Sequence, residues 1–269
     1  MRRGMRVSLA VGLITSVASV ASAHAPTSAV TRCSADAVVA GSVCLDRYEA
    51  SVWRVPNPTT ANAILVRRIQ QGRATRADLL AGGSTPLGIA SDDYAPCTDN
   101  GQSCANDIFA ISLSSEIPSS HITWFQALEA CANAGKRLPT SAEWQVGANG
   151  TQDPGPDNRT TDCNTAGDGT VIRTGSRSGC VSARGAFDMV GNVMEWVADW
   201  VPVSAECPGW ASFSDDIMCL AGATTTSAGP GALIRGGGPF GGEVNGPLVV
   251  IGTIDPTRDE DFIGFRCAR

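Results

Sequence analysis

Residues 135–144 read Gly135-Lys136-Arg137-Leu138-Pro139-Thr140-Ser141-Ala142-Glu143-Trp144. Thr140 and Glu143 have the spacing of a capping box, in which a threonine hydroxyl and a glutamate carboxylate each accept a backbone N–H at the first turn of a helix. This pattern predicts a helix that begins at Thr140 and ends near Gly150, with Trp144 and Val146 facing the interior.

A second helix is predicted directly before this stretch, from about Thr123 to Ala134. Phe125, Leu128 and Cys131 recur at three-residue intervals, which places them on one face of a helix. Gly135 then marks the end of the helix, because glycine is the residue that most often follows a helix C-terminus.

The rest of the chain predicts short strands and long loops. Extended strands are expected between Cys33 and Val55, and a helix over residues 62–81. Their expected apolar contacts come from Val43, Leu45, Tyr48, Val52, Trp53, Ile64, Leu65, Ile69 and Leu79. Residues 82–101 read as a surface loop, and almost no regular structure is expected between Gly150 and Leu233. The end of the chain, 262–267, predicts a buried strand.

Composition excludes several classes of protein. The chain has 269 residues, of which 43% are hydrophobic and 17% charged, and a formal net charge of −6. This composition excludes a disordered chain, and the acidic balance argues against nucleic acid as a partner. Thirty glycines and 15 prolines argue against a helical bundle.

The N-terminus predicts export. Arg2, Arg3 and Arg6 precede an apolar stretch, and Ala21-Ser22-Ala23 has the small residues of a cleavage site. We therefore expect a signal peptide at 1–23, an N-terminal segment at 24–42 and a single domain at 43–269. A retained membrane anchor is the alternative, but the apolar stretch is short for one. After cleavage the exported protein, periplasmic or extracellular, is not expected to contact a membrane.

The cysteines predict disulfides, because an exported chain matures in an oxidising compartment. Eight of the ten fall into close pairs: Cys33 with Cys44, Cys97 with Cys104, Cys163 with Cys180, and Cys207 with Cys219. Pairing close neighbours costs little chain entropy and leaves Cys131 and Cys267 as a long-range pair. Zinc binding is the alternative use of cysteine, but no C-x-x-C occurs.

Six segments in order resemble signatures of the formylglycine-generating enzyme family, also called sulfatase-modifying factors. Residues 135–144 are similar to its GKRLPTEAEWE signature, and 191–200 (GNVMEWVADW) to GNVWEWxxDW. Residues 234–238 (IRGGG) are similar to RGGS, 264–267 to GFRC, 121–124 (HITW) to HVSW, and 48–49 to an early YEVT-like strand. The resemblance implies one loop-rich α+β domain related to the C-type lectin fold, stapled by disulfides. It also implies that Cys131 pairs with Cys267.

The resemblance fails at the family's catalytic cysteines. Active members oxidise a cysteine of a sulfatase to formylglycine with oxygen, and two thiols five residues apart hold copper(I). Gly241 and Gly246 occupy the matching positions, and Gly238 replaces the serine of GGS. Copper(I) prefers soft sulfur ligands, so formylglycine-generating activity is not expected.

The resemblance further implies a calcium site made by Asp188, Gly191, Val193 and Glu195. Calcium takes six to eight hard oxygens, which carbonyls and two carboxylates of one loop can largely supply. The alternative is that Glu195 only pairs with an arginine, such as Arg184 or Arg266. A second calcium site would involve Asn164 and Asp168, although the family's spacing is not preserved there.

Two functions remain open. The first is a calcium-binding accessory domain that binds a protein, peptide or glycan. The second is a divergent oxidoreductase that uses another metal or a cofactor, for which Glu243 and Asn245 are the polar candidates near the glycine-rich turn. Only His24 and His121 could add imidazole ligands, which makes a zinc or iron centre hard to build. Trp210, flanked by Cys207 and Cys219, is a candidate ligand contact.

Overall fold

The computed structural model describes residues 32–152, 157–166, 169–202, 215, 217–219 and 230–269. These residues form ten strands in three sheets, four α-helices and one 3-10 helix, joined by long loops. The helices are α1 (Ala63–Gln70), α2 (Arg76–Ala81), α3 (Trp124–Asn133), α4 (Ser141–Ala148) and η1 (Gly242–Val244). The predicted loop-rich α+β class is confirmed.

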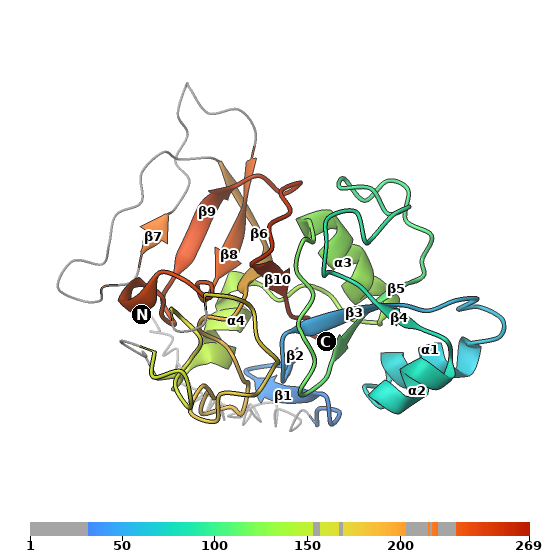
Figure 1. Ribbon diagram of the computed structural model, residues 1–269, viewed down its shortest axis with the longest axis horizontal. Coiled ribbons are helices and arrows are strands. Elements are labelled where there is room, and N and C mark those ends of the chain that lie inside the picture. Colours follow the sequence, from blue (N-terminus) through green and yellow to red (C-terminus); the bar gives the residue numbers. More distant parts are fainter. Residues whose placement is uncertain (1–31, 153–156, 167–168, 203–214, 216, 220–229) are drawn as a thin grey trace, which may run out of the picture. The chain divides into compact units, whose positions relative to one another are not determined.

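The largest sheet has five strands in the order β10-β6-β8-β9-β7 (Figure 1). Its strands are β6 (Met194–Pro202), β7 (Met218–Cys219), β8 (Pro230–Arg235), β9 (Val250–Ile254) and β10 (Ile263–Phe265). β10 lies parallel to β6, while β8 is antiparallel to both β6 and β9. The predicted lack of regular structure up to Leu233 is therefore wrong. Glu195 and Asp199 interrupt the apolar pattern of β6, which hides the strand from sequence reasoning.

A three-stranded sheet has β3 (Ala50–Arg54) at its centre, between β4 (Thr85–Pro86) and β5 (Ile108–Ser112). All five residues of β5 are buried. Earlier in the sequence than β3, the strands β1 (Ala37–Ala40) and β2 (Val43–Asp46) form an antiparallel hairpin. The strands expected between Cys33 and Val55 are thus present.

The helix predicted over 62–81 is two helices. α1 ends before Gly72, whose φ of +64° is the left-handed conformation that glycine adopts without strain. α2 then begins with its own capping box, in which Thr75 and Asp78 each accept a backbone N–H of the other. Leu65, Ile69 and Leu79 are buried as expected, but Ile64 is 65% exposed.

The helices predicted on either side of Gly135 are confirmed as α3 and α4, and both have capping boxes, at Thr123 and Thr140. Their buried faces differ from the prediction. Leu128 is 36% exposed and Val146 37% exposed. α3 instead buries the small residues Ala127 and Ala130 beside Cys131, because they allow the helix to pack closely.

Trp144 is completely buried, as predicted, and so is Trp196. Trp124 is half-buried and Trp200 is 40% exposed, so the four tryptophans of the family motifs are not all core residues. Trp200 packs edge-on against Trp124 at a ring distance of 5.0 Å. Trp210 lies outside the described residues.

Four of the predicted disulfides are present: Cys33–Cys44, Cys97–Cys104, Cys163–Cys180 and Cys131–Cys267. The last one spans 136 residues and ties α3 to the segment after β10. Cys207 of the predicted Cys207–Cys219 pair lies outside the described residues, as do the signal peptide at 1–23 and its cleavage site. Among the described helices, none is long and apolar enough to cross a membrane.

The last residues of the chain are part of the interior. Cys44 and Arg269 exchange two backbone hydrogen bonds, of 2.9 and 2.8 Å, so the end of the chain pairs with β2. Ala268 pairs in the same way with Arg137. Next to Arg137 in the sequence, Lys136 has an ammonium group that is 1% exposed and contacts the Asp46 carboxylate of β2 at 2.6 Å. The first hairpin and the final strand thus form one unit.

Candidate functional site

The turn before β6 is held in a shape that requires its glycine. Gly191 has a φ of +74°, and a Cβ there would lie 2.3 Å from the backbone oxygen of Asn164. Asn192 also has a positive φ, and its N–H donates to that same oxygen at 2.8 Å. Asp188, with a φ of +55°, completes the turn. The peptide groups of this turn are therefore fixed before any ligand binds.

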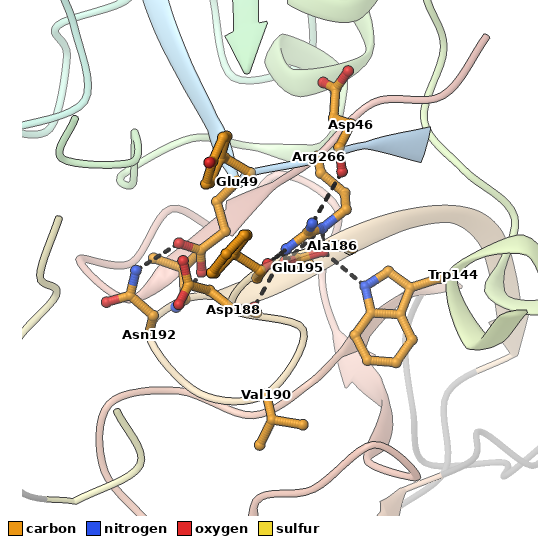
Figure 2. Close-up of polar contacts among 12 residues, drawn as sticks. Asp46, Glu49, Trp144, Ala186, Asp188, Val190, Asn192, Glu195 and Arg266 are labelled. Atoms are coloured by element: carbon orange, nitrogen blue, oxygen red, sulfur yellow. Dashed lines mark hydrogen bonds and ion pairs between the residues drawn. The ribbon is translucent and has the colours of Figure 1, made fainter. Parts of the chain in front are cut away.

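Glu195 lies at the end of this turn and forms a buried ion pair with Arg266 (Figure 2). The guanidinium donates to the two carboxylate oxygens at 2.6 and 2.7 Å, and both side chains are at most 1% exposed. The indole N–H of Trp144 adds a hydrogen bond of 2.7 Å. Of the two arginines considered as partners, Arg266 is the one that pairs, while Arg184 is exposed.

Two further carboxylates surround the same arginine. Glu49 accepts the backbone N–H of Val193 at 3.0 Å and the side-chain amide of Asn192 at 2.5 Å. Asp188 accepts the N–H of Gly175 at 2.6 Å. Figure 2 shows Glu49 and Asp188 directed toward the same region as Glu195. Sequence reasoning missed Glu49 as a site residue, although Tyr48-Glu49 is part of the resemblance.

Burial shifts the protonation of these acids. Burial, followed by the nearby charges of Asp188 and Glu195, raises the pKa of Glu49 well above its usual range. Burial also raises the pKa of Asp188, to about 7. Three carboxylates share one guanidinium, so the ionised cluster would carry a charge of −2, which is costly away from water. Such a cluster favours either bound protons or a bound cation.

The geometry limits what kind of cation can bind. In the described part of the chain, no three His, Cys, Asp or Glu side chains are arranged to hold a metal ion. Any cation would therefore need carbonyl oxygens, which calcium accepts and zinc does not favour. Of the predicted calcium ligands, Asp188, Gly191 and Val193 lie on the turn and Glu195 is the second residue of β6. The site itself stays a prediction.

The second predicted cation site is only half described. Asn164 is 2% exposed, and its amide donates to the carbonyl of Thr170 at 2.8 Å and to the Asn192 side chain at 3.2 Å. Its side-chain oxygen has no hydrogen-bond partner among the described residues. Asp168 lies outside them, so this site also stays a prediction.

The glycine-rich turn after β8 is closed by Asn245, which is 5% exposed. Its carboxamide donates to the carbonyls of Gly238 at 2.9 Å and Phe240 at 2.6 Å. A Cβ on Gly237 would lie 2.1 Å from the Asn245 oxygen. Gly241, at a position where the family resemblance places a thiol, adopts a φ of +109°. The side chain of Asn245 thus holds the turn together.

The other candidates do not assemble into a centre. Glu243 is exposed, and Asn245 is engaged by carbonyls, so they do not form a ligand pair. His121 has a φ of +51°, and its ring lies 3.4 Å from the Ser91 hydroxyl. His24 lies outside the described residues. Phe240 is 42% exposed and packs edge-on against Phe262 with ring centres 4.6 Å apart.

Comparison with known proteins defines the class. Residues 96–269 match the model of the sulfatase-modifying factor enzyme 1-like domain, and the chain belongs to this family. It is 33% identical over 101 residues to the formylglycine-generating enzyme of Streptomyces coelicolor. The aligned residues make up 31% of this chain and 32% of that enzyme. It is 37% identical over 81 residues to the serine/threonine-protein kinase pkn1 of Chlamydia caviae. These aligned residues make up 29% of this chain and 13% of the kinase. The chain therefore spans about a third or less of these relatives.

Solved structures are similar at low sequence identity. The Major Tropism Determinant I1 variant is 18% identical, with a TM-score of 0.46 over 84% of this chain and 50% of that one. PvdO from Pseudomonas aeruginosa is 20% identical, with a TM-score of 0.41 over 84% of this chain and 80% of that one. The family model and the observed elements together define a loop-rich, disulfide-stapled domain of the formylglycine-generating-enzyme type.

Proposed function

We propose that this chain is an exported, calcium-stabilised accessory domain that kept the family fold and binds a ligand without copper chemistry. The observation that carries the proposal is the glycine-rich turn at 236–246, which offers no sulfur and is filled by the Asn245 carboxamide. The ligand class is a protein, peptide or glycan outside the cytoplasm. Nucleic acid and membranes are not expected partners.

Copper(I) does not fit the residues of this turn. Gly241 and Gly246 have no side chains, and residues 238–261 contain no cysteine. Eight of the ten cysteines form the four described disulfides, so none of these eight can supply a thiolate from elsewhere. Since copper(I) needs soft ligands, no redox step is assigned to this turn.

Calcium fits the buried acidic cluster better. Asp188 and Glu195 would supply carboxylate oxygens, and the carbonyls of Gly191 and Val193 would complete part of the coordination shell. A divalent cation would balance the charge that three carboxylates leave around Arg266. The Glu195 carboxylate can contact Arg266 and the cation at the same time, because a carboxylate has about four acceptor positions.

Calcium binding is tested by the thermal stability of the signal-cleaved protein in chelator and in calcium. We expect about one or two calcium ions per chain and a higher Tm with calcium, because a ligand that binds only the folded state stabilises it. Asp188→Asn should remove most of this gain, and Glu195→Ala should do the same. Asp255→Asn, an exposed carboxylate away from the turn, is the control and should keep the gain.

The loss of copper chemistry has its own assay. The purified protein is incubated with copper(I), oxygen and a cysteine peptide of the kind that formylglycine-generating enzymes oxidise. Mass spectrometry should show no aldehyde product. Formation of formylglycine, or an unchanged calcium response in both Asp188→Asn and Glu195→Ala, would overturn the corresponding half of the proposal.

A further inference from the structure

Four apolar side chains form a partly exposed patch where α3 contacts the end of β6. Trp124, Phe125 and Leu128 come from α3, and Trp200 comes from β6. The three aromatic rings pack edge-on against one another, with centres 5.0 to 5.6 Å apart. Trp200 is 40% exposed and Leu128 is 36% exposed. Exposed aromatic rings that are held rigidly offer a ligand contact area at a low cost in conformational entropy.

The ring at the base of the patch is fixed by the backbone around it. The indole N–H of Trp124 donates to the carbonyl of Val197 at 2.8 Å, and its backbone N–H donates to the carbonyl of Pro256 at 2.9 Å. Its ring also contacts both Phe125 and Trp200. The patch therefore has its shape before a ligand binds, which favours affinity.

A polar hollow lies beside this patch. It has a volume of about 500 Å³, is open to solvent, and is lined by Thr98, Asp99, Asn100, Gln102, Ser103 and Thr257. Each of these side chains carries a hydroxyl, amide or carboxylate group. The hollow adjoins the aromatic rings, because a Cβ on Gly101 would lie 3.1 Å from the Cβ of Phe125. Thr257 directly follows Pro256, the residue that accepts the backbone N–H at the start of α3.

The loop that supplies most of the lining residues is anchored to α3. The Cys97–Cys104 disulfide joins the two ends of this loop. Thr123, the N-cap of α3, donates its hydroxyl to the carbonyl of Asp99 at 2.8 Å. Gln126 of α3 donates to the carbonyl of Cys97 at 2.9 Å and to the Asp99 carboxylate at 3.5 Å. The polar hollow and the aromatic patch are thus held by the same helix.

The polar groups of the hollow are partly engaged within the protein. The side-chain oxygen of Asn100 accepts the Thr98 hydroxyl at 2.8 Å and the backbone N–H of Gln102 at 3.2 Å. The Thr257 hydroxyl donates to the Asp255 carboxylate at 2.7 Å. The amide nitrogen of Asn100 and the amide oxygen of Gln102 are not used in these bonds, and both residues are exposed. The hollow therefore offers a ligand both donors and acceptors.

We infer that the patch and the hollow together bind a neutral glycan. A sugar ring has a face of C–H groups, which packs on aromatic rings, and hydroxyls at its edge, each of which donates and accepts hydrogen bonds. Trp200 and Phe125 contact the first, and Asn100 and Gln102 bind the second. Among the described residues that line the hollow, Asp99 is the one charged group, which disfavours an anionic glycan.

This inference rests on the proposed function, because it names the class of ligand that the accessory domain binds. The patch lies at the opposite end of β6 from Glu195, so the residues that bind the glycan are not those of the proposed calcium turn. Binding of the glycan therefore needs no contact with calcium.

The test begins with an array of immobilised glycans that carries neutral oligosaccharides of hexoses and N-acetylhexosamines beside sialylated and sulfated ones. We expect the full, signal-cleaved chain to bind neutral members. Titration with the neutral oligosaccharide that binds best should then change the tryptophan fluorescence of the protein, because the sugar covers Trp200. Trp200→Ala and Gln102→Ala should each weaken binding about tenfold. Gln102 is exposed, so its variant should fold even where Trp200→Ala does not.

The control is Phe240→Ala, which removes an aromatic side chain of similar exposure, 42%, from the glycine-rich turn after β8. Its affinity should match that of the unchanged protein. Binding to no neutral glycan, an equal loss of affinity in Phe240→Ala, or unchanged affinity in both Trp200→Ala and Gln102→Ala would overturn the inference. A protein that binds no glycan and keeps its calcium response would contradict this inference and leave the calcium proposal standing.

Discussion

Arg266 is the residue on which the buried cluster depends. Its guanidinium contacts both oxygens of Glu195 and donates to the carbonyl of Asp46 at 3.1 Å. The resemblance of residues 264–267 to GFRC includes Arg266. An ion pair between Arg266 and Glu195 was predicted as one alternative to calcium binding by Glu195. The arrangement of Glu49 and Asp188 around it could not be predicted, because those residues meet only after distant segments pack together.

Removing this arginine should destabilise the protein strongly. Arg266→Met would leave Glu195 buried without its charged partner, which typically costs about 3–5 kcal/mol of unfolding free energy. Urea unfolding in chelator, followed by tryptophan fluorescence, measures the loss. The double variant Arg266→Met/Glu195→Gln should recover most of it. A single variant within about 1 kcal/mol of the parent would show that the pair contributes little.

At the scale of the element, the Thr140–Glu143 capping box located the start of α4 correctly. The spacing of apolar residues and Gly135 located α3. Burial was less predictable, because the faces of these helices are selected by tertiary neighbours rather than by the apolar pattern of the helix itself. β6 was missed for a related reason. Its charged residues are satisfied inside the protein, Glu195 by Arg266 and Asp199 by the N–H of Ser141 at 2.6 Å.

The cap of α4 should make stability depend on pH. The Arg137 guanidinium beside Glu143, together with the cap hydrogen bonds, lowers the pKa of that carboxyl to about 2. A lowered pKa stabilises the folded state above the unfolded pKa of about 4.3, and this contribution is lost as the pH falls toward 2. Because the pair is largely exposed, we expect less than about 1 kcal/mol.

This contribution is measured by urea unfolding of the parent and of Glu143→Gln at pH 7 and pH 3. The parent should be more stable than the variant at pH 7, and the difference should narrow at pH 3. Arg258 and Glu260 form a comparable exposed pair elsewhere, so Glu260→Gln is the control. A difference between parent and Glu143→Gln that is the same at both pH values would contradict the assignment.

The whole molecule is held together by links between distant segments. The resemblance and the spacing of the cysteines predicted the Cys131–Cys267 disulfide, and the structure contains it. The two predicted calcium sites and the ligand stay proposals, because they depend on atoms that approach only in the folded chain.

Removal of this disulfide should cost more than removal of a short-range one. With separations of 136 and 11 residues, the chain-entropy model gives losses of about 5 kcal/mol for Cys131→Ala/Cys267→Ala and about 3 kcal/mol for Cys33→Ala/Cys44→Ala. Guanidinium unfolding of both double variants measures the difference. Equal losses would show that constraint of the unfolded chain is not the main effect.

The pairing of β2 with the segment after β10 also bears on the order in which the fold assembles. Asp46 and Cys267, which hydrogen-bond to each other, lie 221 residues apart in the chain. Contacts between such distant segments must close a long loop, which makes them slower to form than contacts within a hairpin. β1 and β2 can therefore pair with each other well before β2 meets its second partner.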